Sequence, residues 1–182
     1  PDDAEAHNDL GYALVSGGAL DDAMAEFRSA IALSPDYPDA HYNLASALAQ
    51  TDNPREAVAE YRKALALKPD YPNAQAGLGT MLALEGRTGE AIPLLQKAVQ
   101  KAPAHLPARM GLALALSNAG RTQDALIHAK QAVTLSNGEN PRSLELLGRL
   151  YAQLGQQANA VETTRQAVDV ATRIGDRQLA DD

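Results

Sequence analysis

The sequence repeats itself with a period of 34 residues. The tripeptide Pro-Asp-Tyr at 35–37 returns at 69–71, and the same offset connects a series of small residues. Insertion of one residue near Asn140 restores the phase for a fifth copy. Fifteen positions related in this way are all glycine or alanine: Gly11, Ala45, Gly79, Ala113 and Gly148; Ala23, Ala57, Ala91, Ala125 and Ala160; Ala30, Ala64, Ala98, Ala132 and Ala167. Because a fixed period of this length is typical of proteins that stack one supersecondary unit, it constrains the fold more than any other feature.

The period divides the chain into five copies and a short tail. The copies are residues 4–37, 38–71, 72–105, 106–139 and 141–174. Residues 1–3 are predicted to be the end of a preceding repeat, because Pro1 is in phase with Pro35 and Pro69. Residues 175–182 are predicted to be the truncated start of a further or capping helix. We therefore expect a segment of a larger protein, with uncapped ends that are able to associate with another copy.

Each copy is predicted to form two helices. Apolar residues recur four positions apart in the first half of a copy, as at Leu10 and Leu14, which is typical of one face of a helix. Glycine follows in most copies, as at Gly18, where we expect a left-handed cap. A proline such as Pro35 then ends the second helix. The composition agrees, because 36 alanines and only 4% aromatic residues favour helices over strands.

A pattern of bulky, small and terminal residues recurs in these helices. Copy one carries it as His7, Leu10, Gly11, Leu14, Ala23, Phe27, Ala30 and Pro35, and copy two as His41, Leu44, Ala45, Leu48, Ala57, Tyr61, Ala64 and Pro69. The pattern resembles that of the tetratricopeptide repeat (TPR) family. In copies four and five the aromatic place is taken by Ala129 and Thr164, and the proline place by Asn137 and Thr172. The resemblance covers residues 4–174 and implies an all-α fold, a right-handed α-solenoid of helix-turn-helix units.

The TPR resemblance also implies where a partner binds. The face of each first helix that points away from its Leu/Gly stripe is expected to line a concave groove, which would receive a peptide or a partner helix. The residues expected to contact the partner are Asn8, Tyr12, Asp39, Tyr42, Asn43, Ser46, Asn73, Thr80, Met110, Arg142 and Arg149. This surface changes from acidic and polar, through an apolar middle, to basic. The whole chain follows the same trend, because residues 1–91 contain 6 Lys/Arg and 15 Asp/Glu, whereas residues 92–182 contain 10 and 8.

Composition excludes several classes of function. The net charge of −7 argues against a nucleic-acid partner, which requires a basic surface. No apolar run is long enough to span a membrane, so we expect no membrane insertion. The absence of cysteine excludes disulfides, thiolate metal sites and a cysteine nucleophile. Cytoplasmic and periplasmic locations both remain open.

No catalytic, cofactor-binding or metal-binding residue is predicted. The sequence contains no Gly-rich phosphate loop, no HExxH and no nucleophile elbow. His7 and His41 occupy equivalent places and are predicted to fill the bulky packing position, since no carboxylate or third histidine has ligand spacing around them. Glu56 and Glu60 on the second helices are predicted to be solvated on the convex side.

The function predicted from these features is a non-catalytic protein-interaction scaffold. Two alternatives stay open, namely a substrate-recognition arm of a larger enzyme such as a glycosyltransferase, and a structural or oligomerisation module. The carboxylate clamp by which some TPR domains bind chaperone C-terminal tails is not expected. Its places correspond to Asn8, Tyr12, Asn43, Asn73 and Gly77, of which only Asn43 has the required residue type.

Overall fold

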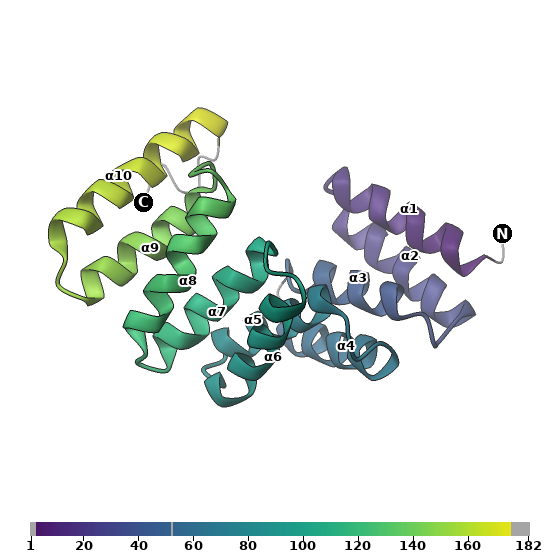
Figure 1. Ribbon diagram of the computed structural model, residues 1–182. Helices are drawn as coiled ribbons and strands as arrows, with labels where there is room; N and C mark the ends of the chain where they lie inside the picture. Colours follow the sequence, from purple (N-terminus) through teal and green to yellow (C-terminus); the bar gives the residue numbers. More distant parts are fainter. Residues whose placement is uncertain (1–2, 52, 176–182) are drawn as a thin grey trace.

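The computed structural model describes residues 3–51 and 53–175, and within them the chain forms ten α-helices and no strand (Figure 1). The structure therefore confirms the all-α fold. The helices are α1 (Ala4–Ser16), α2 (Leu20–Leu33), α3 (Pro38–Leu48), α4 (Pro54–Leu67), α5 (Pro72–Leu84), α6 (Thr88–Lys101), α7 (Leu106–Asn118), α8 (Thr122–Leu135), α9 (Pro141–Gln153) and α10 (Gln157–Ile174).

The helices form five hairpins that follow one another along an arc, with α1 and α10 at opposite ends (Figure 1). The second helices α2, α4, α6 and α8 each contact both their partner in the hairpin and the first helix of the next hairpin. Successive first helices also contact one another. This pattern of neighbour contacts is that of a helical-repeat solenoid, in which each unit is stabilised mainly by the units beside it.

Turn residues decide where the helices end. The glycines predicted as caps, Gly18, Gly86, Gly120 and Gly155, all have positive φ angles between 72° and 80°. In the second hairpin, Pro54 instead occupies the first position of α4, where its missing N–H costs no helical hydrogen bond. The last second helix is longer than the others: α10 has 18 residues and ends at its cap Gly175, which has a positive φ angle, whereas α2, α4, α6 and α8 have 14 residues each.

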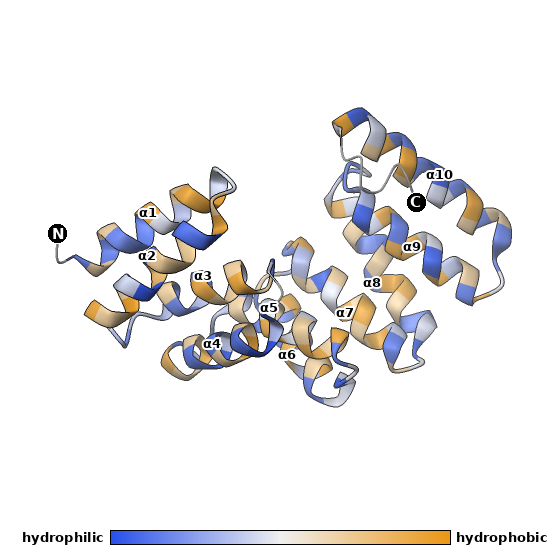
Figure 2. Ribbon diagram, turned by 180° about the vertical axis from the view of Figure 1, so that it is seen from behind, coloured by the Kyte–Doolittle hydropathy of each residue, from blue (hydrophilic) through white to orange (hydrophobic). Residues whose placement is uncertain are grey.

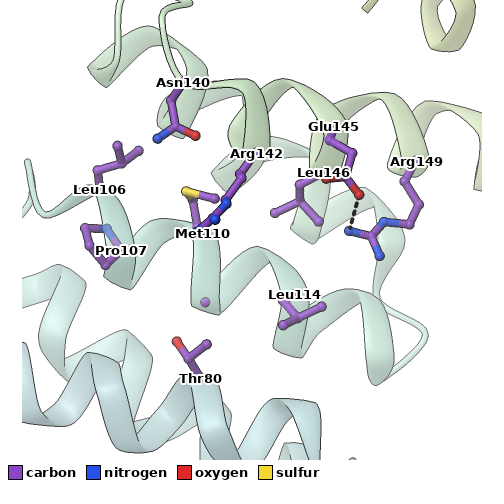
Figure 3. A pocket seen from close by; sticks show the side chains of 11 residues that line it. Thr80, Leu106, Pro107, Met110, Leu114, Asn140, Arg142, Glu145, Leu146 and Arg149 are labelled. Carbon is purple, nitrogen blue, oxygen red and sulfur yellow. Dashed lines mark ion pairs between the residues drawn. The ribbon is translucent and has the colours of Figure 1, made fainter. Parts of the chain in front are cut away.

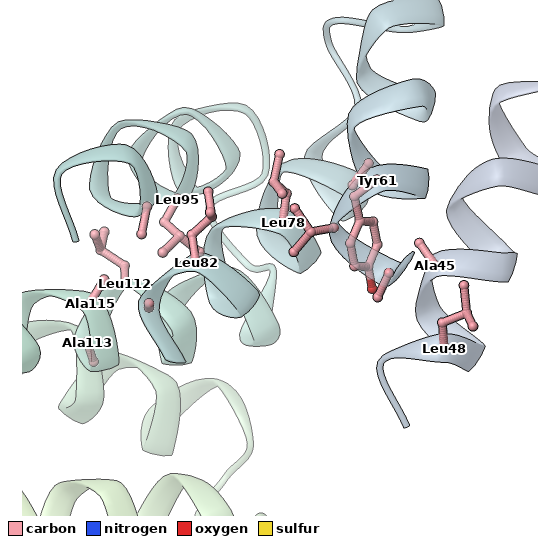
Figure 4. Packing of buried hydrophobic residues seen from close by; sticks show 14 of the residues in the cluster. Ala45, Leu48, Tyr61, Leu78, Leu82, Leu95, Leu112, Ala113 and Ala115 are labelled. Carbon is pink, nitrogen blue, oxygen red and sulfur yellow. The ribbon is translucent and has the colours of Figure 1, made fainter. Parts of the chain in front are cut away.

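The core lies between the helices and is almost wholly aliphatic. A single cluster of buried apolar residues extends from Ala23 in α2 to Leu150 in α9 (Figure 4). Small residues of one helix face large ones of its partner. A Cβ atom added at Gly11 would lie 2.6 Å from Phe27 Cε1, and one added at Gly79 would lie 2.5 Å from Leu95 Cγ. Hydrophilic and hydrophobic stretches alternate along every helix, as expected where one face of each is buried (Figure 2).

The packing between α5 and α7 is closer than that between other successive first helices. Gly111 of α7 lies directly against Thr80 of α5, and a Cβ atom at Gly111 would clash with the Thr80 hydroxyl and with Leu95. At the far end of the same junction, Asn118 Nδ2 donates a hydrogen bond of 2.8 Å to the carbonyl oxygen of Ala83. The glycine therefore lets the two helices approach each other, and the asparagine ties their ends.

Candidate partner-binding groove

A cavity of about 640 Å³ opens between α5, α7 and α9 (Figure 3). Its lining residues are Thr80, Leu106, Pro107, Met110, Gly111, Leu114, Asn140, Arg142, Glu145, Leu146 and Arg149. Apolar side chains from α7 and α9 form its floor, and the charged side chains all come from α9. Cavities of this size and mixed character are typical of sites that hold part of a ligand.

Helical spacing explains why these side chains meet. Met110 and Leu114 are four residues apart on α7, so they lie on one face of that helix. Arg142 and Arg149 are seven residues apart on α9 and share a face in the same way, with Leu146 between them. Gly111 also lines the cavity, at the point where α7 packs closely against Thr80 of α5.

The charges along α9 are available to a ligand. Arg149 Nη2 lies 3.6 Å from Glu145 Oε1, in an exposed pair of the kind that contributes little to stability and exchanges readily (Figure 3). Arg142 is exposed and forms no ion pair within the described part of the chain. A carboxylate placed in the cavity would therefore find guanidinium donors.

A second cavity, of about 290 Å³, continues this groove toward the N-terminal repeats. It is lined by Tyr42, Tyr61, Asn73, Ala76, Gly77, Thr80, Met81, His105 and Pro107, and it shares Thr80 and Pro107 with the first cavity. The Tyr42 ring centroid lies 6.1 Å from that of Tyr61, and the Tyr61 hydroxyl lies 3.2 Å from Ser46 Oγ. Burial raises the pKa of Tyr61 to about 12, so its hydroxyl stays neutral and can donate a hydrogen bond.

Six of the residues predicted from the sequence line these two cavities. Thr80, Met110, Arg142 and Arg149 line the larger one. Tyr42, Asn73 and again Thr80 line the smaller one. The predicted apolar middle and basic end of the surface are thus brought together in one groove over α3, α5, α7 and α9.

The other predicted residues lie outside both cavities: Asn8, Tyr12, Asp39, Asn43 and Ser46. Asn8 is buried, and its Oδ1 accepts a hydrogen bond of 2.8 Å from Asn43 Nδ2, so these two amides join α1 to α3. Asp39 lies 3.8 Å from Lys68 Nζ. Tyr12 is exposed at the N-terminal end of the surface. These side chains form junctions or open surface.

Seven residues that line the larger cavity were not among the predicted contacts: Leu106, Pro107, Gly111, Leu114, Asn140, Glu145 and Leu146. Leu106 is the first residue of α7, and Asn140 lies just before α9. The prediction considered only which side chains share a face within a helix, so it did not cover residues at the helix entries. Asn140 marks the one-residue insertion in the repeat, and its side chain accepts a hydrogen bond of 2.9 Å from the Ser143 amide. The inserted residue was the sequence signal that could have indicated Asn140, since an extra residue between repeats must change the path of the chain into the next helix.

The prediction that Glu60 is solvated is wrong. Glu60 is buried, and its Oε2 lies 2.6 Å from Nδ1 of His41, which is also buried. His41 Nε2 lies 2.9 Å from the carbonyl oxygen of Pro35, and Lys63 Nζ donates to Glu60 Oε1 at 2.7 Å. Burial acts to raise the pKa of Glu60, but the hydrogen bonds from Lys63 and His41 outweigh it and hold the pKa below its ordinary value. His41 does occupy the predicted bulky packing position, where it is the polar partner of Glu60.

The same position joins the other repeats through polar bonds. His7 Nδ1 lies 2.5 Å from Glu26 Oε2, in a half-exposed copy of the His41–Glu60 pair. Gln75 and Arg109, which follow at the same place, donate to the carbonyl oxygens of Pro69 and Pro103 at 2.8 and 2.7 Å. The position thus holds the end of one repeat against the start of the next. In the described residues, no group of three or more His, Cys, Asp or Glu side chains is placed to hold a metal ion.

Comparisons with known families match almost the whole chain. A model described as "Tetratricopeptide repeat" matches residues 42–105 and 110–174, a second of that description matches 82–133, and one described as "TPR repeat" matches 11–52. The chain belongs to the tetratricopeptide repeat family. A search of curated protein sequences found no match.

Solved TPR structures share this fold. TTC0263, a thermophilic TPR protein of Thermus thermophilus, is 22% identical with a TM-score of 0.80, covering 98% of this chain and 97% of its own. MamA of Desulfovibrio magneticus RS-1 is 21% identical with a TM-score of 0.75, covering 93% and 96%. YrrB, titled a TPR protein with an unusual peptide-binding site, is 24% identical with a TM-score of 0.69, covering 98% and 90%. Among the described residues, none of the TPR helices combines the length and apolar character that crossing a bilayer requires.

Proposed function

We propose that this TPR chain is a non-catalytic interaction scaffold that binds a peptide or partner helix across α5, α7 and α9. The observation that carries the proposal is the cavity of about 640 Å³, with its apolar floor and its arginines. Its position on the first helices is the one in which stacked repeats build an extended binding surface. The likeness in fold to YrrB, whose title names a peptide-binding site, supports the same reading.

The lining residues indicate the chemistry of the ligand. Met110, Leu114 and Leu146 would take one apolar side chain, since a flexible methionine beside two leucines adapts to aliphatic and aromatic shapes alike. Arg142 and Arg149 would pair with a carboxylate near that side chain. The ligand that fits is therefore a segment with an apolar anchor followed or preceded by Asp or Glu.

The smaller cavity would hold the remainder of the segment. Asn73 and Thr80 offer amide and hydroxyl groups that can pair with a peptide backbone, which has one donor and one acceptor per residue. Tyr42 and Tyr61 would contribute aromatic contact area at the end of the groove that lies nearest the N-terminal repeats. The acidic residue of the bound segment would lie toward α9, where both arginines are.

Binding can be tested with short fluorescent peptides and measured by anisotropy. One set of peptides carries a Leu, Met or Phe near an Asp or Glu, and the matched set carries Lys in place of the acid. We expect the acidic set to bind and Met110→Glu to weaken its binding by about tenfold or more, because a buried apolar anchor is typically worth more than 1 kcal/mol. Arg142→Glu should abolish the preference for the acidic set.

Arg62→Glu provides the control, because Arg62 is exposed on the second helix α4 and lies outside both cavities. Circular dichroism of each variant checks that the helices remain. If no peptide of either set binds, or if Arg62→Glu weakens binding as much as Arg142→Glu, the groove is not the binding site and the proposed function is wrong.

A further inference from the structure

Tyr61 belongs to the second helix α4, yet it lines the smaller cavity of the groove. Its ring lies between α3 and α5 and is 4% exposed (Figure 4). Gly77 of α5 makes room for this ring, because a Cβ atom there would lie 2.4 Å from Tyr61 Cζ and 2.7 Å from the hydroxyl oxygen. At the other junctions between repeats the equivalent residues are Phe27, Leu95 and Ala129, which have no polar side-chain atom. The second-to-third junction thus differs from the others in bringing a hydroxyl to this place.

A chain of hydrogen bonds determines where the hydroxyl proton of Tyr61 points. Ser46 Oγ donates to the carbonyl oxygen of Tyr42 at 2.9 Å, and a carbonyl oxygen can only accept. Because serine has a single hydroxyl proton, Tyr61 must be the donor in the 3.2 Å contact between its hydroxyl and Ser46 Oγ. The Tyr61 oxygen itself accepts no hydrogen bond within the described part of the chain. Toward a ligand in the cavity, Tyr61 is therefore an acceptor.

The smaller cavity is polar but uncharged. His105 is the one lining residue, among those that the structure describes, that could carry a charge near neutral pH. Its Nδ1 accepts a hydrogen bond of 3.1 Å from the Ala108 amide, and burial lowers the pKa of the imidazole, so the ring is neutral at pH 7. A charged ligand group would lose its hydration here without gaining a counter-charge, which is costly. An uncharged polar group is the kind of ligand that fits.

The hydroxyl of Thr80 supplies the donor that Tyr61 lacks. Thr80 follows Gly77 by three residues on α5, so the two lie on one face of that helix, about 5–6 Å apart. Its side chain has no hydrogen-bond partner among the described residues. The cavity therefore presents an acceptor beside Gly77 and a donor one helical turn further on.

We propose that the smaller cavity holds a carboxamide side chain, Asn or Gln, of the bound segment, an inference that rests on the proposed function. The amide nitrogen donates to the Tyr61 hydroxyl oxygen, and the amide oxygen accepts from the Thr80 hydroxyl. A carboxamide has both groups side by side, whereas a carboxylate lacks the donor and an ammonium group lacks the acceptor.

The two cavities together set the order of residues in the segment. They share Thr80 and Pro107, and the arginines lie at the far end of the larger one, on α9. The carboxamide residue therefore lies on the side of the apolar anchor opposite to the acidic residue. Packed helices are about 8–10 Å apart and an extended chain rises about 3.3 Å per residue, so anchor and carboxamide are separated by about three residues.

The test uses the acidic peptides with Gln, Asn, Met or Glu placed at that position, in both chain directions, and measures binding by anisotropy. We expect Gln or Asn to bind about fivefold more tightly than Met, and Glu to bind most weakly. Tyr61→Phe keeps the ring beside Gly77 and removes the hydroxyl, so it should abolish the advantage of Gln over Met. Tyr71→Phe is the matched control. Its ring centroid lies 5.0 Å from that of Tyr42, but Tyr71 does not line the cavity, so the advantage should remain.

Ser46→Ala tests the direction of the proton. Without Ser46 Oγ the Tyr61 hydroxyl is free to donate to a ligand, and a carboxylate is the stronger acceptor. We expect the Glu peptide to gain severalfold relative to the Gln peptide in this variant. Circular dichroism verifies that each variant is folded.

The outcomes separate this inference from the proposed function. Equal binding of the Gln, Asn and Met peptides would overturn the carboxamide site, and so would an advantage of Gln that survives Tyr61→Phe or is lost equally in Tyr71→Phe. An unchanged ratio of Glu to Gln in Ser46→Ala would overturn it as well. In each of these cases, binding that still depends on Met110 and Arg142 would leave the proposed function standing. If no peptide binds at all, both proposals are wrong.

Discussion

Two junctions of the same solenoid are built from different chemistry. Between the first and second repeats, Asn43 donates to Asn8, so that paired amides set the distance between α1 and α3. Between the third and fourth repeats, Gly111 lies against Thr80, so that the absence of a side chain allows a closer approach of α7 to α5. One period of 34 residues therefore accommodates a polar junction and a close-packed one. The candidate binding cavity lies beside the second kind.

The histidines differ between the same two regions. His41 is buried against Glu60 at hydrogen-bond distance, so that each of the two polar side chains has the other as a partner. Within residues 3–51 and 53–175, no carboxylate lies at hydrogen-bond distance from His105 or His128, and burial lowers the pKa of each imidazole. His128 Nδ1 is buried without a hydrogen-bond partner in the described part of the chain. The N-terminal repeats thus stabilise charge inside the fold, whereas the C-terminal repeats favour neutral imidazoles.

The largest effect should come from breaking the buried pair in the second repeat. We expect His41→Leu to lower the free energy of unfolding by about 3 kcal/mol, because it leaves Glu60 buried with only Lys63 as a partner. His7→Leu, at the half-exposed equivalent, should cost about 1 kcal/mol or less. Urea unfolding followed by circular dichroism measures both. His41→Leu combined with Glu60→Leu should recover much of the loss, and equal losses for the two single variants would refute the distinction between the pairs.

A smaller and more even effect is expected from overpacking the hairpins. Ala57 in the second repeat and Ala91 in the third are both fully buried against their partner helices. Ala57→Leu and Ala91→Leu should each cost about 1–3 kcal/mol, since the extra atoms force the helices apart. Ala25→Leu is the control, because Ala25 is exposed on α2. Thermal unfolding provides the comparison, and a loss in the third repeat alone would show that the two regions differ in hairpin packing as well as in their junctions.

The smallest effect should appear as a dependence on pH. His105 caps α7 by accepting a hydrogen bond of 3.1 Å from the Ala108 amide, which only a neutral ring can do. Burial lowers the pKa of His105 below 6.5, so the unfolded chain binds the proton more tightly. This stabilisation is complete above about pH 6.5 and is lost as the pH falls toward the lowered value.

The N-terminal repeats should lose stability only at a lower pH than the C-terminal ones. The pKa of Glu60 is below its ordinary 4.5, so its contribution is present above that value and is lost as the pH falls through the lowered one. Melting temperatures measured between about pH 7.5 and pH 4 should therefore begin to fall near pH 6.5. His105→Asn, which keeps a capping acceptor at every pH, should flatten the first part of this fall. An unchanged profile in that variant would exclude His105 as its source.

Much of the fold was predictable because its determinants are local. The period, the helix pairs and the glycine turns depend on residues that are three, four or 34 positions apart, and Gly18 and Pro54 take the conformations that their chemistry requires. Part of the candidate site was predictable for the same reason. Met110, Arg142 and Arg149 lie on the expected face of their helices, and the cavity gathers them.

Contacts between helices were not predictable in this way. His41 and Glu60 are 19 residues apart, so no spacing within one helix indicates that they meet. Their contact depends on how the hairpin turns one helix toward the other. Leu106 and Asn140 likewise reach the cavity from the entries to α7 and α9, where the path of the chain depends on its packing against the preceding repeat.

The sequence by itself determined that this chain is a stack of five TPR hairpins, because a regular period needs only local helix formation and small residues at fixed places. Only the tertiary structure decided which of the first-helix residues share a cavity, which become junctions, and which acidic side chain is buried. It also decided which apolar positions the neighbouring repeats cover. The physical reason is that side chains on different helices are positioned by the rotation and separation of those helices. Both depend on every residue packed between the helices. Gly111 shows this by lying directly against Thr80, and Asn43 by its hydrogen bond to Asn8.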